Sequence, residues 1–77
     1  MQKSLDVLKP GEQGTVVSLT AEPKIKRRLF DMGLTPGAKV IMRKEAPLGD
    51  PIEINVRGYQ LSLRKYEAAG VTVEVGE

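Results

Sequence analysis

The sequence predicts an all-β domain: a small barrel of short strands, with one helix inserted between the first strand and the second. Eight glycines and five prolines in 77 residues leave most segments between them too short for a helix. Several of these segments alternate apolar and polar residues, as strands with one buried face do. An open sheet of such strands would leave an apolar face in water and two edges unpaired. We therefore expect five such strands to close on themselves, with the helix capping one end.

The first strand is predicted at residues 14–19. The pairs Pro10-Gly11 and Pro36-Gly37 each stand just ahead of a β-prone run. Pro followed by Gly at the central positions is typical of a type II turn, because glycine accepts the positive φ that this turn requires. We expect a strand-entry turn at each pair.

The helix is predicted over residues 22–32. Pro23 suits its first turn, because the N–H that proline lacks would have no helical partner there. Gly33 is placed for a left-handed C-cap, which would let Leu34 pack back on the last turn. Apolar residues spaced i, i+4 and i+7 form one stripe that should face the core. They are Ile25, Leu29 and Met32.

The second strand is predicted at residues 39–44. In one phase Val40 and Met42 face inward, with Ile41 and Arg43 outward. The opposite phase would bury the guanidinium group of Arg43, which is costly without a partner. We therefore expect the first phase.

Three further strands are predicted in the last third of the chain. Residues 52–57 and 59–64 each alternate strictly, and a tight turn at Arg57-Gly58 should join them into a hairpin. Residues 65–69 are expected to form one helical turn. The chain then enters a fifth alternating strand at residues 71–75.

The composition excludes several kinds of site. With no Cys and no His, the chain forms neither disulfides nor a Cys/His zinc site. A catalytic site would have to use Asp, Glu, Lys, Ser or Tyr, and the carboxylates are scattered along the chain. There is no phosphate-binding P-loop, and so small a domain has little room for a substrate pocket. We expect a protein that is not an enzyme and has no cofactor.

A metal site built from carboxylates alone is the remaining option. Asp50 and Glu53 are the closest pair. Fe(II) sites usually combine imidazole with carboxylate, and the two side chains need not converge across the start of a strand. We expect no stable iron site in this chain.

The net charge of +2 is too weak to demand a nucleic-acid partner. No apolar stretch approaches the roughly 18 residues that cross a membrane, and the N-terminal segment, interrupted by Asp6, is unlike a signal peptide. We expect one cytosolic domain over residues 1–77, without membrane insertion, as a monomer or weak homo-oligomer.

The loop 46–51, Ala-Pro-Leu-Gly-Asp-Pro, is the most distinctive connection in the chain. Two prolines restrict its backbone, and a rigid loop loses little entropy on binding. Pro47, Leu48 and Asp50 are therefore candidate partner contacts. The alternative is a connection that serves the fold, with Leu48 tucked into the barrel.

The predicted helix is strongly basic around its polar face. Its cations form either an anion-binding surface or a solvated face opposite the core. Phe30, beside the apolar stripe, is either an exposed anchor or part of the packing. The helix residues that we predict as partner contacts are Arg27, Arg28 and Phe30.

Arg57 belongs to the predicted hairpin turn, and Tyr59 and Arg64 follow it. They are also candidate partner contacts. The alternative is that they are strand-face side chains beside a turn glycine.

Four motifs follow one another along the chain: Leu-x-Pro-Gly-x-x-Gly from Leu8, RLFDMGLTPG from Arg28, APLGDPI from Ala46 and RGYQLSLR from Arg57. This ordered series resembles the ferrous iron transport protein A (FeoA) family. It also resembles the SH3-like carboxy-terminal domains of some iron-responsive repressors. The match covers nearly the whole chain, and the order of the motifs carries it.

The resemblance implies a five- to six-stranded SH3-like barrel and a cytosolic role beside FeoB, the G-protein-coupled Fe(II) permease. The predicted function is thus a non-catalytic accessory protein that binds the cytosolic domain of FeoB and supports or regulates it. Two alternatives stay open. One is a regulatory or peptide-binding module of the repressor kind, although no helix-turn-helix accompanies it. The other is a small nucleic-acid-binding barrel, although paired aromatic residues for base stacking are lacking.

Overall fold

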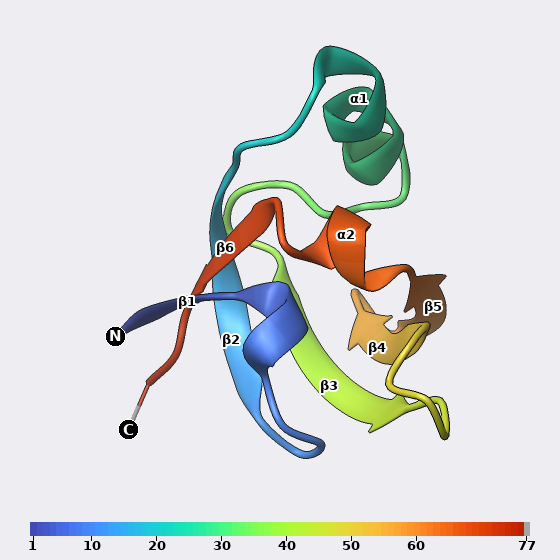
Figure 1. Cartoon of the computed structure of the whole chain (residues 1–77). Helices are drawn as coiled ribbons and strands as arrows, with labels where there is room; N and C mark the ends of the chain where they lie inside the picture. Colours follow the sequence, from blue (N-terminus) through green and yellow to red (C-terminus); the bar gives the residue numbers. More distant parts are fainter. Residues whose placement is uncertain (77) are drawn as a thin grey trace.

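The computed structural model describes residues 1–76, and in it six antiparallel strands form one strongly curved sheet (Figure 1). The strands are β1 (Gln2–Ser4), β2 (Gln13–Leu19), β3 (Lys39–Glu45), β4 (Ile52–Val56), β5 (Tyr59–Leu63) and β6 (Val71–Glu74). The helical segments are the 3-10 helix η1 (Leu5–Val7), α1 (Pro23–Asp31) and α2 (Lys65–Ala68). The strand order is β1-β6-β2-β3-β4-β5, so β1 and β5 are the two edges of the sheet. The predicted all-β class, with one main helix before the third strand, is confirmed.

Strand β1 is the only one of the six strands described that was not predicted from the sequence. It has three residues, too few to show an alternating pattern. It forms because it lies antiparallel to β6, with Lys3 opposite Val73. A pairing between residues 70 positions apart leaves no local signal.

Both predicted type II turns are present. The glycines of Pro10-Gly11 and Pro36-Gly37 have φ of +92° and +93°. In each turn the N–H of the residue after the glycine donates to the carbonyl before the proline, at 2.9 Å. The turns direct the chain into β2 and β3, as the Pro-Gly pairs predict.

Helix α1 has the predicted core stripe and C-cap. Leu29 is fully buried, while Ile25 and Met32 are partly buried against the core. Gly33, at φ +97°, ends the helix in the left-handed conformation. The Leu34 N–H then donates to the Leu29 carbonyl at 3.0 Å, which is the reverse bond of a Schellman motif, and Leu34 is buried.

The inward face of β3 is the predicted one, with Val40 and Met42 fully buried and Arg43 exposed. Register shifts leave Val17 of β2 and Arg43 of β3 as extra residues opposite their neighbouring strands. Such bulges bend strands and so help this sheet to curl. The predicted turn at Arg57-Gly58 has two positive φ values, +51° and +90°, as a type I′ hairpin does.

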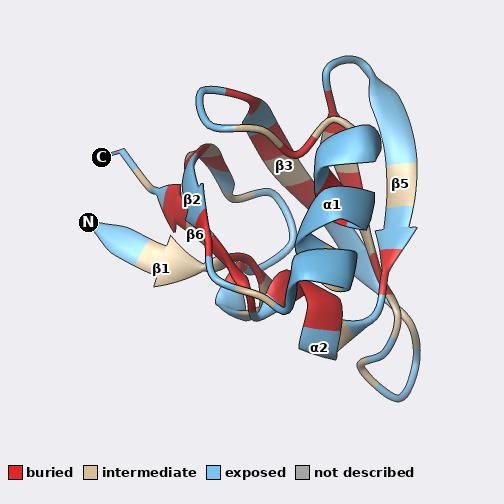
Figure 2. Cartoon of the chain, turned by 90° about the horizontal axis from the view of Figure 1, so that it is seen from above, coloured by how far each residue is buried: buried red, intermediate tan, exposed pale blue. Residues whose placement is uncertain are grey.

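The core lies inside the curved sheet. Figure 2 shows buried stretches in β2, β3, β6 and α2. The apolar side chains of the core come from every strand except β1. The largest fully buried ones are Leu5, Leu8, Leu29, Leu34, Met42, Ile52, Ile54 and Leu63.

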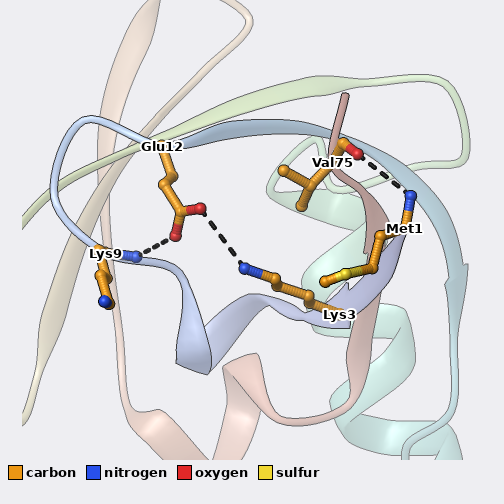
Figure 3. A network of polar contacts seen from close by, with 5 residues as sticks. All are labelled: Met1, Lys3, Lys9, Glu12 and Val75. Atoms are coloured by element: carbon orange, nitrogen blue, oxygen red, sulfur yellow. Dashed lines mark hydrogen bonds and ion pairs between the residues drawn. The ribbon is translucent and has the colours of Figure 1, made fainter. Parts of the chain in front are cut away.

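Polar contacts fasten the N-terminal segment to the sheet (Figure 3). The Met1 amine donates to the Val75 carbonyl at 3.2 Å. The Glu12 carboxylate accepts the Lys9 N–H at 2.7 Å and lies 3.5 Å from the Lys3 ammonium. The Lys9 hydrogen bond, with the charge of Lys3 as a smaller contribution, lowers the pKa of Glu12 below its usual 4.5.

Candidate partner-binding surface

The hairpin of β4 and β5 is bonded to the end of α1 through two of the predicted site residues. Arg57 Nε donates to the Gly33 carbonyl at 3.2 Å, and its Nη2 donates to the Thr35 hydroxyl at 2.6 Å. The Tyr59 hydroxyl donates to the Met32 carbonyl. The Tyr59 bond gives a partner to the Met32 carbonyl at the helix end, where carbonyls lack internal partners. Both residues therefore have a structural role in holding α1 to the hairpin.

The loop 46–51 is held against the start of α2. The Asp50 carboxylate accepts the Lys65 backbone N–H at 2.9 Å, and it lies 3.8 Å from the guanidinium of Arg64. On the other side of the loop the Lys65 ammonium lies 4.0 Å from Glu45. Asp50 and Arg64, predicted separately as site residues, are thus neighbours.

The tip of this loop presents an apolar side chain to solvent. Leu48 is 95% exposed and Pro47 is exposed beside it, so the alternative in which Leu48 fills the barrel is wrong. The Gly49 N–H donates to the Ala46 carbonyl at 2.7 Å, and the Ala46 N–H donates to the Pro51 carbonyl at 3.0 Å. The turn is therefore internally bonded, and Leu48 projects from a supported frame.

On α1 the predicted residues differ in their surroundings. Arg28 forms an ion pair with Glu67 of α2 at 2.9 Å, whereas Arg27 is exposed and has no carboxylate partner among residues 1–76. Phe30 is 37% exposed, and the Lys26 ammonium lies 6.0 Å from the centre of its ring. Phe30 is therefore neither a core residue nor a fully exposed anchor.

Glu67 is a residue of this region that sequence reasoning missed. Its side chain is only 2% exposed. One carboxylate oxygen accepts the backbone N–H of Arg64 at 3.0 Å, and the other lies against Arg28. Its place three residues after the N-cap, typical of a capping-box glutamate, was the available signal.

The structure gathers the predicted residues around β5 rather than in one pocket. Arg57 and Tyr59 lie at the start of the strand, bonded to α1. The residues at its other end are Pro47, Leu48, Asp50 and Arg64. The helix residues Arg27, Arg28 and Phe30 lie on α1, which Figure 2 shows on the same side of the molecule as β5. The result is a candidate docking surface along a strand, with apolar and charged groups at its ends.

The two carboxylates considered for a metal site each lie beside a basic side chain of the protein. Asp50 lies beside Arg64, and Glu53 pairs with Lys44 at 3.9 Å. Within the described residues, no group of three or more Asp or Glu side chains is arranged to hold a metal ion. Over the same residues, no helix has both the length and the apolar character needed to cross a membrane.

The curled six-stranded sheet, with its inserted helix and bonded loops, defines a small SH3-like barrel domain. The FeoA domain model matches residues 3–75, and the chain belongs to the FeoA family. The resemblance inferred from the ordered motifs is thereby confirmed.

One curated relative is the Fe(2+) transport protein A/Fe(2+) transporter FeoB fusion protein of Porphyromonas gingivalis, 31% identical over 71 residues. The match covers 92% of this chain and 8% of the relative, so the chain spans only a small part of that protein's length.

Solved structures of FeoA proteins have a similar fold. The FeoA protein from Chlorobium tepidum is 47% identical, with a TM-score of 0.90 over 97% of this chain and 71% of that one. The FeoA of Stenotrophomonas maltophilia, described as an SH3 domain protein complexed with zinc, is 31% identical. Its TM-score is 0.80 over 96% of this chain and 89% of that one.

The fold is also similar to that of a manganese-dependent transcriptional repressor. The TM-score is 0.90, over 97% of this chain and 37% of the repressor, at 18% sequence identity. At that identity the likeness concerns the fold alone. It adds no function.

Proposed function

We propose that this chain is a cytosolic, non-catalytic accessory protein of ferrous iron uptake, which binds the Fe(II) permease FeoB and supports or regulates it. The observation that carries the proposal is the fusion protein of Porphyromonas gingivalis, in which a segment like this chain belongs to one polypeptide with an FeoB transporter. Fusion keeps two modules at high effective concentration, which is useful where they bind each other.

The surface around β5 supports docking as the mode of action. Its most exposed apolar group, Leu48, stands on an internally bonded turn, and an ordered loop loses little entropy when it meets a partner. Aromatic and arginine side chains, the types enriched in binding hot spots, lie at Phe30, Tyr59 and Arg64. We propose that residues 1–77 act as one domain through this surface.

The small pocket of the barrel and its residue types favour a binding protein over an enzyme. A shallow pocket of about 140 Å³ lies between β2, β3 and residues 74–76, beside Thr15, Lys39 and Glu74. Ligand and substrate sites commonly span about 300–1,000 Å³. Neither imidazole nor thiol is available in the chain to act as base or nucleophile.

The test is direct binding to full-length FeoB reconstituted in nanodiscs, measured by biolayer interferometry and by calorimetric titration, with and without guanine nucleotide. We expect saturable binding that empty nanodiscs do not reproduce. Absence of binding in both nucleotide conditions contradicts the proposal. An isolated chain that turns over a substrate contradicts its non-catalytic part.

A further inference from the structure

We propose that the free edge of β5 is a docking strand, to which an extended segment of the permease adds as a further strand of the sheet. The inference rests on the proposed function, and it specifies where and how the two proteins meet.

The backbone of β5 has unused hydrogen-bonding groups. The strand pairs only with β4, and Val56 lies opposite Tyr59 across the two-residue turn. In such a hairpin the residues flanking the turn exchange both backbone bonds, and bonded pairs recur at every second position. Leu61 and Leu63 therefore bond β4, while the N–H and C=O groups of Gln60 and Ser62 point away from it. No other backbone group of residues 1–76 bonds to these two residues.

The two edges of the sheet differ in how they resist pairing. The β1 edge is three residues long and carries Lys3 and the terminal amine. Short length and lysine are common devices that protect an edge from unwanted strands. The β5 edge has five residues, Tyr-Gln-Leu-Ser-Leu, without lysine, proline or a bulge. Both views show β5 as the outermost strand on its side of the molecule (Figures 1 and 2).

Apolar surface lies beside the free backbone groups. Tyr59 is 45% exposed, and Leu61, two residues on along the same face of the sheet, is only partly buried. Side chains of an added strand would cover both. Leu48 stands beyond the other end of the strand, next to Asp50 and Arg64. In strand addition the backbone bonds supply affinity and such flanking contacts supply specificity.

The charges at the strand ends favour an acidic partner segment over a second copy of this chain. Two copies could share all the free groups only if Gln60 of one paired with Ser62 of the other. In that register, where residue numbers sum to 122, the cations that follow the ends of each strand, Arg57 of the turn and Lys65 of α2, would approach each other at both ends. Like charges brought close together repel, which disfavours this pairing. Arg57 has no carboxylate partner among residues 1–76, so an Asp or Glu of the permease fits beside it.

Proline substitutions test the backbone contact. Ser62→Pro and Gln60→Pro each remove an outward N–H and place a ring where the added strand would lie. Because these N–H groups point away from β4, the hairpin keeps its hydrogen bonds between β4 and β5. Edge strands tolerate proline at such positions for this reason. Ser62→Ala and Gln60→Ala are the matched controls, since they alter the side chain and keep the N–H. Slow amide exchange in β2 and β6 would confirm that each variant is folded.

With full-length FeoB in nanodiscs, we expect each proline variant to bind about tenfold more weakly or worse, from lost bonds and the steric block. The alanine variants should stay within about twofold of the wild type, as exposed substitutions do. In the wild-type complex, hydrogen exchange of the peptide that contains β5 should slow relative to the free chain.

Three outcomes overturn the inference while the proposed function stands. In the first, both proline variants bind FeoB with wild-type affinity. In the second, the proline and alanine variants lose affinity equally. In the third, FeoB slows hydrogen exchange in other segments and leaves that of β5 unchanged. Protection of β5 in the isolated chain that rises with its own concentration would assign the edge to a second copy and also overturn it. If the wild-type chain does not bind FeoB at all, the proposed function fails and this inference fails with it.

Discussion

Arg28 of α1 and Glu67 of α2 form an ion pair at 2.9 Å in which the Glu67 side chain is buried and the Arg28 side chain is 63% exposed. The pair joins two helical segments that are 39 residues apart in the chain. It also neutralises a carboxylate that would otherwise be costly inside the protein. The basic face of α1 is therefore not uniform: one of its arginines belongs to the fold.

Arg28→Ala should destabilise the protein by about 1–3 kcal/mol, because Glu67 loses its cation while it remains buried. Arg27→Ala, one residue away and exposed, should change stability by no more than about 0.5 kcal/mol. Urea denaturation of both variants measures the contrast. Equal effects of the two substitutions would mean that the Arg28–Glu67 pair contributes little in solution.

Gly33→Ala should cost more stability than Gly37→Ala, although both glycines have positive φ, of +97° and +93°. The left-handed backbone costs a non-glycine residue about 1–2 kcal/mol at each site. A Cβ at Gly37 meets nothing within 4 Å, whereas one at Gly33 would lie 2.7 Å from the Tyr59 hydroxyl. That hydroxyl would have to leave the Met32 carbonyl, at a further cost of about 1 kcal/mol.

The Tyr59→Phe background isolates this contact. Without the hydroxyl, the extra cost of Gly33→Ala over Gly37→Ala should disappear in thermal melts of the double variants. A difference of unchanged size would show that Tyr59 is not its cause.

Stability should fall as the pH drops below the usual glutamate value of 4.5, in part because of Glu12. The Lys9 N–H and the Lys3 ammonium hold the pKa of Glu12 lower in the folded state than in the unfolded chain. The stabilising contribution is therefore present above pH 4.5 and is lost as the pH falls through the folded-state pKa. The terminal amine also lowers the pKa of Glu74, so this carboxylate contributes to the same loss of stability in acid.

Melting temperatures measured between neutral and acidic pH check this expectation. Glu12→Gln removes the titrating group, so its melting temperature should decline less steeply with acidification than that of the wild type. Identical slopes for the two proteins would contradict the assignment to Glu12.

Leu48→Asp should weaken binding to FeoB about tenfold or more, because the substitution puts a charge on an apolar contact at the tip of the loop. Its stability should change by no more than about 0.5 kcal/mol, since Leu48 touches little of the fold. Val7→Asp, at an exposed apolar residue of η1, is the control. Affinity lost equally in both variants, or in neither, would remove Leu48 from the docking surface.

Local signals were enough to predict much of this fold. The Pro-Gly turns, the glycine cap of α1 and the strict alternation of β4 depend on nearest neighbours, and the structure has them where they were expected. The inward face of β3 was also predictable, because the other phase would have buried Arg43. The ordered motifs identified the family for the same reason, since they are the residues that form these turns and caps.

The candidate site was less predictable than the fold. Leu48 could have filled the barrel or faced solvent, and Phe30 could have lain in the core or on the surface. The spacing of neighbouring apolar residues does not decide between these environments. Arg57 and Tyr59 turned out to bond the end of α1, across 22 to 27 residues of chain. Such roles depend on which segments become neighbours when the sheet curls.

The sequence by itself determined the turns, the helix with its cap, the faces of the longer strands and the family. These features follow from the φ preferences of Gly and Pro and from apolar periodicity, which act within a few residues. Only the tertiary structure decided that β1 exists, that Glu67 is buried beside Arg28 and that β5 ends the sheet with its outer groups free. Each depends on contacts between distant residues, whose free energy is gained only once the chain has closed.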